Sequence, residues 1–249
     1  AFGVKLVNPP PKTVSDWPCF RHDARRGNRI DSMVASDAKL LWTAKIVEKS
    51  KAGMSNSLPE DWTTNPIVTG PLTAPTVAFD GTVFMALPDR HQIIALNNQT
   101  RETLWRYIAG GRIDTPPTIH RNLCLFGCHD GWVYCLNAKD GKLIWRFHAA
   151  LEERRILVYG QLESVWPVFG SVPVINDIVY FSAGRSSCSD KGIVVYALEI
   201  LTGNLLWKKS IFLPKDGHHG HVNDLLVSDG AHLYLGDQQF DLKTGATQN

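Results

Sequence analysis

The segment 216–224 holds the densest group of side chains that could bind a metal ion. It contains His218, His219 and His221, with Asp216 and Asp224 at its two ends. Imidazole nitrogens and carboxylate oxygens are ligands that suit zinc and copper. Their spacing matches no established metal motif, and the glycines between them are typical of a flexible connection. The three histidines are therefore a candidate metal site, and a solvated loop is the favoured alternative.

Two other groups of residues could contact a ligand or a partner. Arg21, His22 and Arg25 lie close to Trp17 in a basic segment, a combination that can bind phosphate or polysaccharide. The alternative is a lead-in segment whose arginines pair with carboxylates beneath the fold. Trp166, in an aromatic stretch at 165–170, could stack on a sugar or a peptide, although core packing is favoured.

The sequence contains no recognisable catalytic motif. None of the nine histidines has a serine nucleophile in a nucleophile-elbow context. A phosphate-binding loop and a dinucleotide-binding glycine motif are also missing from the sequence. No catalytic residue is predicted, and a non-catalytic role is favoured over an enzymatic one.

Composition places the chain among globular proteins. Of its 249 residues, 44% are hydrophobic and 20% are charged, which excludes a disordered or collagen-like chain. The 26 basic and 24 acidic side chains give a formal charge of +2. A net charge this small does not favour binding to nucleic acid or to an anionic membrane surface. No apolar run approaches the ~18 residues of a membrane span.

The five cysteines leave their redox state open. Cys124 and Cys128 are four residues apart with no second pair, so zinc-site spacing is not present. Cys124 and Cys135 flank a predicted turn and could face each other across a hairpin. Buried thiols are the favoured interpretation, and a disulfide is the alternative.

An internal repeat organises the chain. A strand, a small-residue turn and a second strand with tryptophan recur at Ala95–Trp105, Cys135–Trp145 and Ala197–Trp207. A fourth copy begins at Phe240–Gly245 and predicts only the first three strands of its blade, and a tryptophan strand at 40–46 stands alone. We expect Trp42, Trp105, Trp145 and Trp207 to be structural, because a large ring can cover the gap between neighbouring units while its N–H reaches a backbone carbonyl.

Each repeat contains enough sequence for four short strands. Strands are predicted near 72–79, 82–87, 92–97 and 102–108, and again near 115–119, 122–127, 132–137 and 142–148. Sequential strands should pair antiparallel. Trp105 and Trp145 are 40 residues apart, and insertions near 47–71 and 149–170 lengthen the neighbouring units. Four-stranded units of ~40 residues predict an all-β fold, a β-propeller with about four blades in this chain.

The repeat resembles that of the pyrroloquinoline-quinone-like (PQQ-like) propellers. The pattern Ala-Leu-x-x-x-Thr-Gly-x-x-x-Trp, preceded by a strand with Asp-Gly, fits residues 37–245. Residues 16–28, 111–117 and 154–171 resemble segments of large exported bacterial members. The resemblance implies a lead-in segment at 1–36, propeller repeats at 37–249, and a periplasmic or extracellular location.

The resemblance leaves two functions open, because these propellers include both quinone enzymes and binding scaffolds. Quinone dehydrogenases of this kind have an adjacent cysteine pair near PQQ, and this chain has no such pair. We therefore predict no cofactor, and a non-catalytic scaffold whose ring-face loops bind a protein, peptide or glycan. The alternative is part of a PQQ-dependent or related oxidoreductase whose site lies outside this chain.

The size of the resembled rings predicts that these blades form part of a ring of about eight. In that case two blade faces lack neighbours and should promote self-association. The alternative is a closed four-blade ring, in which residues 40–46 would pair with 237–242.

Replacing Trp105, Trp145 or Trp207 with alanine should lower the free energy of unfolding by about 3–5 kcal/mol, the range for large buried aromatic side chains. Denaturant unfolding followed by circular dichroism measures this loss. Solvent exposure of all three rings would contradict the repeat.

Overall fold

Strands and turns make up the fold. The computed structural model describes residues 17–29, 71–213 and 222–248, together with 36, 37, 39, 40, 42–44 and 46. Within these residues the strands form four four-stranded antiparallel sheets and one separate hairpin. In the same part of the chain, no helix has the length and apolar character needed to cross a bilayer. The predicted all-β propeller fold is confirmed.

Each four-stranded sheet is one blade. Blade 1 contains β1 (Thr76–Val77), β2 (Val83–Leu87), β3 (Gln92–Leu96) and β4 (Thr103–Ile108), with a 3-10 turn at Pro88–Arg90. Blade 2 contains β5 (Thr118–His120), β6 (Leu123–Gly127), β7 (Trp132–Asn137) and β8 (Leu143–His148). The insertion hairpin contains β9 (Arg155–Val158) and β10 (Gln161–Ser164). Blade 3 contains β11 (Val174–Ile175), β12 (Ile178–Ala183), β13 (Ile193–Glu199) and β14 (Leu205–Ile211). Blade 4 contains β15 (Val227–Ser228), β16 (His232–Leu235), β17 (Gln238–Asp241) and β18 (Thr247–Gln248).

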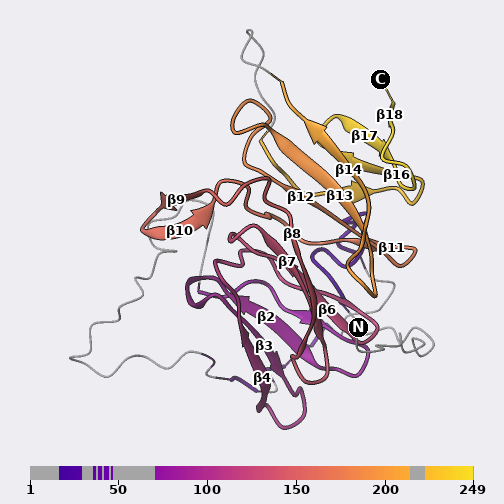
Figure 1. Ribbon diagram of the computed structural model, residues 1–249. Coiled ribbons are helices and arrows are strands. Elements are labelled where there is room, and N and C mark those ends of the chain that lie inside the picture. The colour runs from indigo at the N-terminus through magenta and orange to yellow at the C-terminus, as the bar shows by residue number, and fades with distance from the viewer. Residues whose placement is uncertain are drawn as a thin grey trace.

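The blades follow one another along an arc in chain order (Figure 1). All eight predicted strands of blades 1 and 2 are present, and sequential strands pair antiparallel. The first strand of each of these two blades is shorter than predicted. Pro75, Pro116 and Pro117 have no N–H to donate to a ladder, so the regular strands begin only after them, although the N–H of Thr73 still donates to the Ala86 carbonyl at 3.0 Å.

Apolar cores fill the spaces between blades. Every residue from Ile193 to Leu198 in β13 is buried. Val194 and Tyr196 pack in the core shared with blade 2, whereas Ile193 and Val195 pack in the core shared with blade 4. A blade covered on both faces therefore has continuous apolar strands, which explains why the sequence shows little alternation.

The repeat tryptophans occupy equivalent buried positions, as predicted. Trp105, Trp145 and Trp207 lie on the fourth strands of blades 1, 2 and 3, and each is only 8–9% exposed. Each indole N–H donates a hydrogen bond to a carbonyl of the next blade. The acceptors are Ala138, Ile200 and Leu242, at 2.9, 2.8 and 3.0 Å.

A glycine of the next blade lies against each ring. Gly141, Gly203 and Gly245 have φ of +71°, +70° and +67°. A Cβ at these positions would lie 2.6–2.7 Å from the ring of Trp105, Trp145 or Trp207, respectively. The glycine therefore does more than permit the turn that the sequence predicted: it also lets the ring touch the backbone.

Blade 1 has Arg101 at the position of this glycine. Its φ is +68°, and its N–H donates to the Asn97 carbonyl at 2.8 Å, as Gly141 does to Asn137. The Arg101 guanidinium lies 5.9 Å from the ring centroid of the half-buried Trp42. Trp42 thus makes a cation–π contact where the other three tryptophans pack on glycine.

Blade 4 extends further than the sequence predicted. A fourth strand, β18, pairs with β17 through Gln239–Gln248 and Phe240–Thr247, whereas only three strands were expected. β17 pairs with β16 and β18, and not with those residues of 40–46 that the structure describes. The pairing expected for a closed four-blade ring is therefore not formed in the described part of the chain.

The disulfide alternative is wrong. All five cysteines are free. Cys124 lies opposite Leu136, and Cys135 lies opposite Leu125. Cys124 packs in the core between blades 1 and 2, whereas Cys135 packs between blades 2 and 3. The two thiols lie on opposite faces of one sheet, because side chains alternate along a strand.

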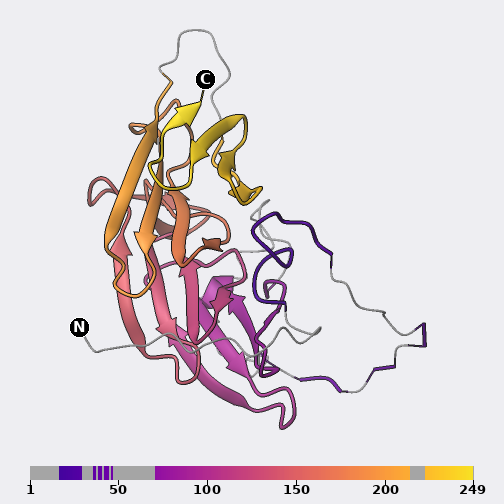
Figure 2. The same ribbon diagram turned by 90° about the vertical axis from the view of Figure 1, so that its right-hand side faces the viewer.

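The lead-in segment, residues 17–29, lies along the inner strands (Figure 2). Trp17 and Val77 exchange two backbone hydrogen bonds at 2.9 Å. The N–H of Ile119 donates to the Pro18 carbonyl, and the N–H of Ser228 donates to the Ala24 carbonyl. This segment consequently joins blades 1, 2 and 4 along their innermost strands.

Arg26 extends these contacts to blade 3. Its guanidinium is buried and donates to the carbonyls of Phe20, Ser171 and Leu226 and to the Ser171 hydroxyl. The expectation that lead-in arginines pair with carboxylates is therefore wrong for Arg26. Backbone carbonyls at the strand ends are its acceptors instead.

Alanine at Gly203 should destabilise the fold more than alanine at Gly236. Both glycines have positive φ, but a Cβ meets the Trp145 ring only at Gly203, and nothing lies within 4 Å at Gly236. We expect a loss of about 1 kcal/mol for Gly236→Ala from backbone strain. Gly203→Ala should lose a further ~1–3 kcal/mol through overpacking. Equal losses in urea unfolding would contradict the proposed ring contact.

Candidate functional site

The strand order gives the blades two different ends. Because each sheet is an antiparallel meander, the second-to-third strand turns and the loops that lead to the next blade share one end. We call this end the crossover face. The opposite end, the turn face, carries the first-to-second and third-to-fourth strand turns.

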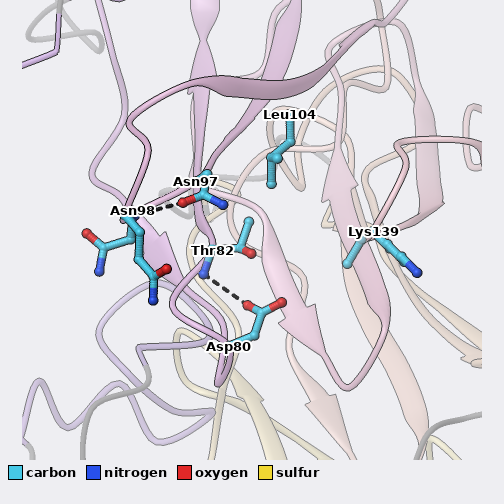
Figure 3. A pocket seen from close by; sticks show the side chains of 8 residues that line it. Asp80, Thr82, Asn97, Asn98, Leu104 and Lys139 are labelled. Atoms are coloured by element: carbon cyan, nitrogen blue, oxygen red, sulfur yellow. Dashed lines mark hydrogen bonds between the residues drawn. The ribbon is translucent and has the colours of Figure 1, made fainter.

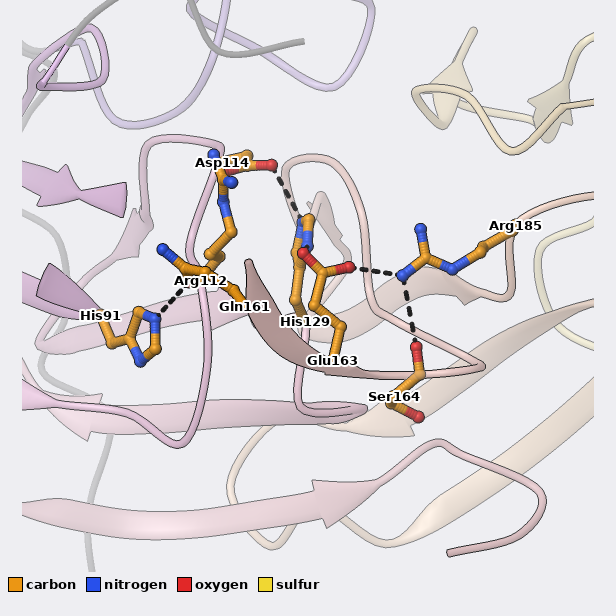
Figure 4. A network of polar contacts seen from close by, with 8 residues as sticks. All are labelled: His91, Arg112, Asp114, His129, Gln161, Glu163, Ser164 and Arg185. Atoms are coloured by element: carbon orange, nitrogen blue, oxygen red, sulfur yellow. Dashed lines mark hydrogen bonds and ion pairs between the residues drawn. The ribbon is translucent and has the colours of Figure 1, made fainter. Parts of the chain in front are cut away.

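A buried ionic cluster lies at the crossover face (Figure 4). Its members are Arg112, Asp114, His129, Glu163 and Arg185. The His129 imidazole lies between two carboxylates, with Nε2 3.1 Å from Asp114 and Nδ1 2.9 Å from Glu163. Arg112 Nε is 3.2 Å from Asp114, and Arg185 pairs with Glu163.

The cluster joins segments that are distant in sequence. Arg112 and Asp114 follow blade 1, and His129 lies in a turn of blade 2. Glu163 belongs to the insertion hairpin, and Arg185 follows β12 of blade 3. The ion pairs therefore fix the loops of three blades relative to one another.

The cluster holds His129 as a cation. Burial opposes its charged form, but contact with Asp114 and Glu163 outweighs this and raises the pKa of His129 to about 9. Burial alone would also raise the pKa of both carboxyls. Contact with His129 and Arg112 nevertheless holds the pKa of Asp114 below its ordinary value. Contact with His129 and Arg185 does the same for the pKa of Glu163. With both nitrogens protonated, His129 can only donate, so the arrangement favours positioning over proton transfer.

An axial cavity of about 530 Å³ opens beside the cluster. Its walls come from equivalent segments that precede the first strands of all four blades, from Pro88, and from Phe20 of the lead-in. Most of the lining is apolar, and the charged lining residues are Asp114 and Asp224. The segments that form it are Leu72–Ala74, Asp114–Pro116, Phe169–Gly170 and Val222–Leu225.

Phe169 connects the cavity with the cluster. It lines the cavity and packs edge-on against His129, with ring centroids 4.7 Å apart. The Arg185 guanidinium lies 5.4 Å from the Phe169 ring. Asp114 contributes to both structures, so the ionic cluster holds part of the cavity wall in place.

A second pocket, of about 390 Å³, lies at the turn face (Figure 3). It is lined by Asp80, Thr82, Asn97, Asn98, Gln99, Leu104, Ala138 and Lys139. The Asp80 carboxylate accepts the Thr82 N–H at 2.9 Å, and the Asn97 side chain accepts the Gln99 N–H at 2.7 Å. These groups maintain turns of blade 1, so the axial cavity is the stronger candidate binding site.

The candidate metal site could not be located in the structure. His218, His219 and His221 lie outside the described residues, and so does most of the insertion at 47–71. Among the described residues, no group of three or more His, Cys, Asp or Glu could hold a metal ion.

The candidate contact residues do not form one site. Arg21 is exposed beside Phe20, and His22 packs edge-on against Trp17. Arg25 is exposed and donates to the Asp229 carbonyl at 3.0 Å. Trp166 is 1% exposed and belongs to the core between blades 2 and 3.

The ionic cluster is not recognisable in the sequence, although the family resemblance includes two of its segments. Residues 111–117 and 154–171 drew attention only through a resemblance. The signal available was a few charged residues, such as Arg112 and Asp114, within loops that are otherwise mostly apolar or small. Nothing in the sequence indicates that Asp114, His129 and Glu163 converge, because each comes from a different structural unit.

Comparisons with known proteins agree with the fold. A family model described as outer membrane protein assembly factor BamB matches residues 26–239. No curated protein matches the chain. A solved quinohemoprotein alcohol dehydrogenase from Comamonas testosteroni superposes with a TM-score of 0.58 at 13% identity, over 72% of this chain and 34% of that one.

A second solved structure gives the same result. Quinohemoprotein alcohol dehydrogenase ADHIIG from Pseudomonas putida HK5 has a TM-score of 0.56 at 16% identity, over 71% of this chain and 33% of that one. This chain thus covers about a third of the length of either enzyme. At these identities the likeness shows the fold alone.

Stability should fall with rising pH through titration of His129. Its folded pKa of about 9 exceeds an unfolded value near 6.5. The stabilisation that protonated His129 adds to the free energy of unfolding is therefore fully present below pH 6.5. It is lost as the pH rises to about 9, by an amount on the order of 3 kcal/mol. Urea unfolding across this range should show a steeper loss for the wild type than for His129→Gln. Parallel pH profiles would contradict the assignment.

Proposed function

Because the chain belongs to the PQQ-like repeat family described as outer membrane protein assembly factor BamB, we propose that it is part of an exported binding scaffold. In this proposal, the scaffold is non-catalytic. Its axial cavity takes up an extended segment of a partner protein. The family description, which concerns assembly at an outer membrane, supports both the exported location and a protein partner.

The construction of the axial cavity carries the proposal. Equivalent segments from all four blades line it, so a single bound segment would contact every blade. Its volume of about 530 Å³ falls in the range of ordinary ligand sites, and its walls are mainly apolar with few polar groups. Such a lining suits apolar side chains of a peptide.

The charges of the cavity favour a peptide with a basic group. Asp224 is exposed at the cavity and has no ion pair among the described residues. Asp114 is already paired with Arg112 and His129. Asp224 is thus the carboxylate available to a lysine, an arginine or an amino group of the bound segment.

The ionic cluster supports binding through rigidity. It fixes Asp114 and packs against Phe169, both of which line the cavity. A site whose walls are held in place before binding loses less conformational entropy when a ligand enters. The buried charges are therefore consistent with a preformed receptor.

The lining of this cavity does not fit pyrroloquinoline quinone. The quinone carries three carboxylate groups, which require cationic partners. The charged residues lining the described cavity are two aspartates, and the neighbouring Arg112 and His129 already pair with Asp114. An oxidoreductase with its site outside this chain would not require peptide binding at this cavity.

A glycan partner has less support than a peptide. The aromatic residues that line the cavity are Phe20 and Phe169, and Phe169 already packs against His129. Trp166, the aromatic residue considered for sugar stacking, is buried in the core.

Filling the cavity should weaken peptide binding. Peptides selected from a phage-displayed library against this chain provide the ligand, and titration calorimetry measures affinity. Ala74 is exposed and lines the cavity, so Ala74→Trp should weaken binding at least about tenfold, a loss of ~1.4 kcal/mol.

Two further variants complete the test. Ala231→Trp introduces the same side chain at an exposed position of the turn face and should leave affinity unchanged. Asp224→Asn should weaken peptides that carry a basic residue more than neutral ones. Equal affinity of the wild type, Ala74→Trp and Asp224→Asn would overturn the proposed site.

A further inference from the structure

The insertion hairpin has its polar and apolar faces reversed. β9 and β10 pair with Leu157 opposite Leu162 and Ile156 opposite Glu163. Gln161 and Glu163, on one face, are buried against the body. Leu157 and Leu162, on the other face, are 74% and 54% exposed. A two-stranded sheet in water normally directs its apolar face inward.

Polar contacts fix this orientation. The Gln161 side chain lies 2.7 Å from His91 Nε2, and Glu163 pairs with His129 and Arg185. The N–H of Ser164 donates to the His129 carbonyl at 2.8 Å. The hairpin cannot rotate its leucines inward without breaking the ionic cluster.

The exposed apolar surface continues towards the tip of the hairpin. Tyr159 in the turn is 49% exposed, whereas Ile156 pairs with Glu163 and so lies on the opposite face. Three large apolar side chains, Leu157, Tyr159 and Leu162, thus gather on a short hairpin that projects from the blades (Figure 1). A concentrated apolar patch of this kind is typical of an interaction site.

The backbone of β9 indicates an extended partner. β10 faces the body, as its contact with His129 shows, whereas β9 pairs only with β10 in the described part of the chain. The outer edge of β9 therefore presents N–H and C=O groups to which another strand can pair.

Arg155 indicates the charge of that partner. The other charged residues at 152–163 are paired: Glu152 with Lys191, Glu153 with His148, Arg154 with Asp190, and Glu163 with His129 and Arg185. Arg155 is exposed and has no ion pair among the described residues. Arg155 is two residues from Leu157, so both side chains lie on the same face of β9.

We propose that the edge of β9 accepts a β-strand from a partner protein, whose alternate side chains are apolar and include one carboxylate. The apolar side chains cover Leu157 and Leu162, and the carboxylate pairs with Arg155. This site is separate from the axial cavity and does not depend on it.

The probe is a fluorescein-labelled synthetic peptide with valines and one glutamate on one face and threonines on the other. Binding to the full chain is measured by fluorescence anisotropy. A twin peptide with N-methylated amides along one edge lacks the donors needed for strand pairing. The unmodified peptide should bind at least about tenfold more tightly than this twin. Equal binding of both, or no binding of either, overturns the proposal.

Matched variants test the side-chain contacts. Leu157→Ser should weaken binding about tenfold, the effect of losing one buried leucine contact. Leu206→Ser changes another exposed leucine, 51% exposed on β14 against 74% for Leu157, and should have no effect. Equal weakening by both variants would contradict a site on the hairpin.

A charge exchange tests the role of Arg155. Arg155→Glu should reject the glutamate peptide and bind a twin in which lysine replaces glutamate. Failure of this exchange overturns the assigned polarity. Ala74→Trp should leave probe binding intact, which separates this site from the axial cavity.

Discussion

The contact between each repeat tryptophan and the glycine of the next blade determines how successive blades pack. The rings of Trp105, Trp145 and Trp207 each lie against a glycine backbone with no room for a Cβ. Each indole N–H also donates to the carbonyl three residues before that glycine, in the same turn. Ring contact fixes the separation of the sheets, while the hydrogen bond fixes their register. This regular spacing brings equivalent loops of different blades together at the crossover face, where the axial cavity and ionic cluster lie.

Much of the fold could be predicted because its signals are local and repeated. The ten-residue interval from Ala95 to Trp105 recurs in blades 2 and 3, and the resulting strands agree closely with the structure. The details that differed depend on features that the repeat pattern does not carry. β1 and β5 are shortened by prolines, while Cys124 and Cys135 are separated by a register that depends on the turn between β6 and β7.

The candidate site could not be predicted in the same way. His129 meets Asp114 and Glu163 only after three structural units have packed, and its raised pKa is a property of that assembly. For Trp166 core packing was the favoured interpretation, and the packing of blades 2 and 3 does enclose it. Conversely, the reversed faces of the insertion hairpin follow from the ionic cluster, because Glu163 must point towards His129 and thereby turns Leu157 and Leu162 outward.

We propose that a rigid crossover face receives a partner segment in the axial cavity. Hydrogen–deuterium exchange of the full chain, with and without a peptide selected against it, is the decisive measurement. Increased protection is expected at 72–74, 114–116 and 222–225, the segments that line the cavity. Protection confined to 97–99 and 138–139, which line the pocket of the turn face, would contradict it.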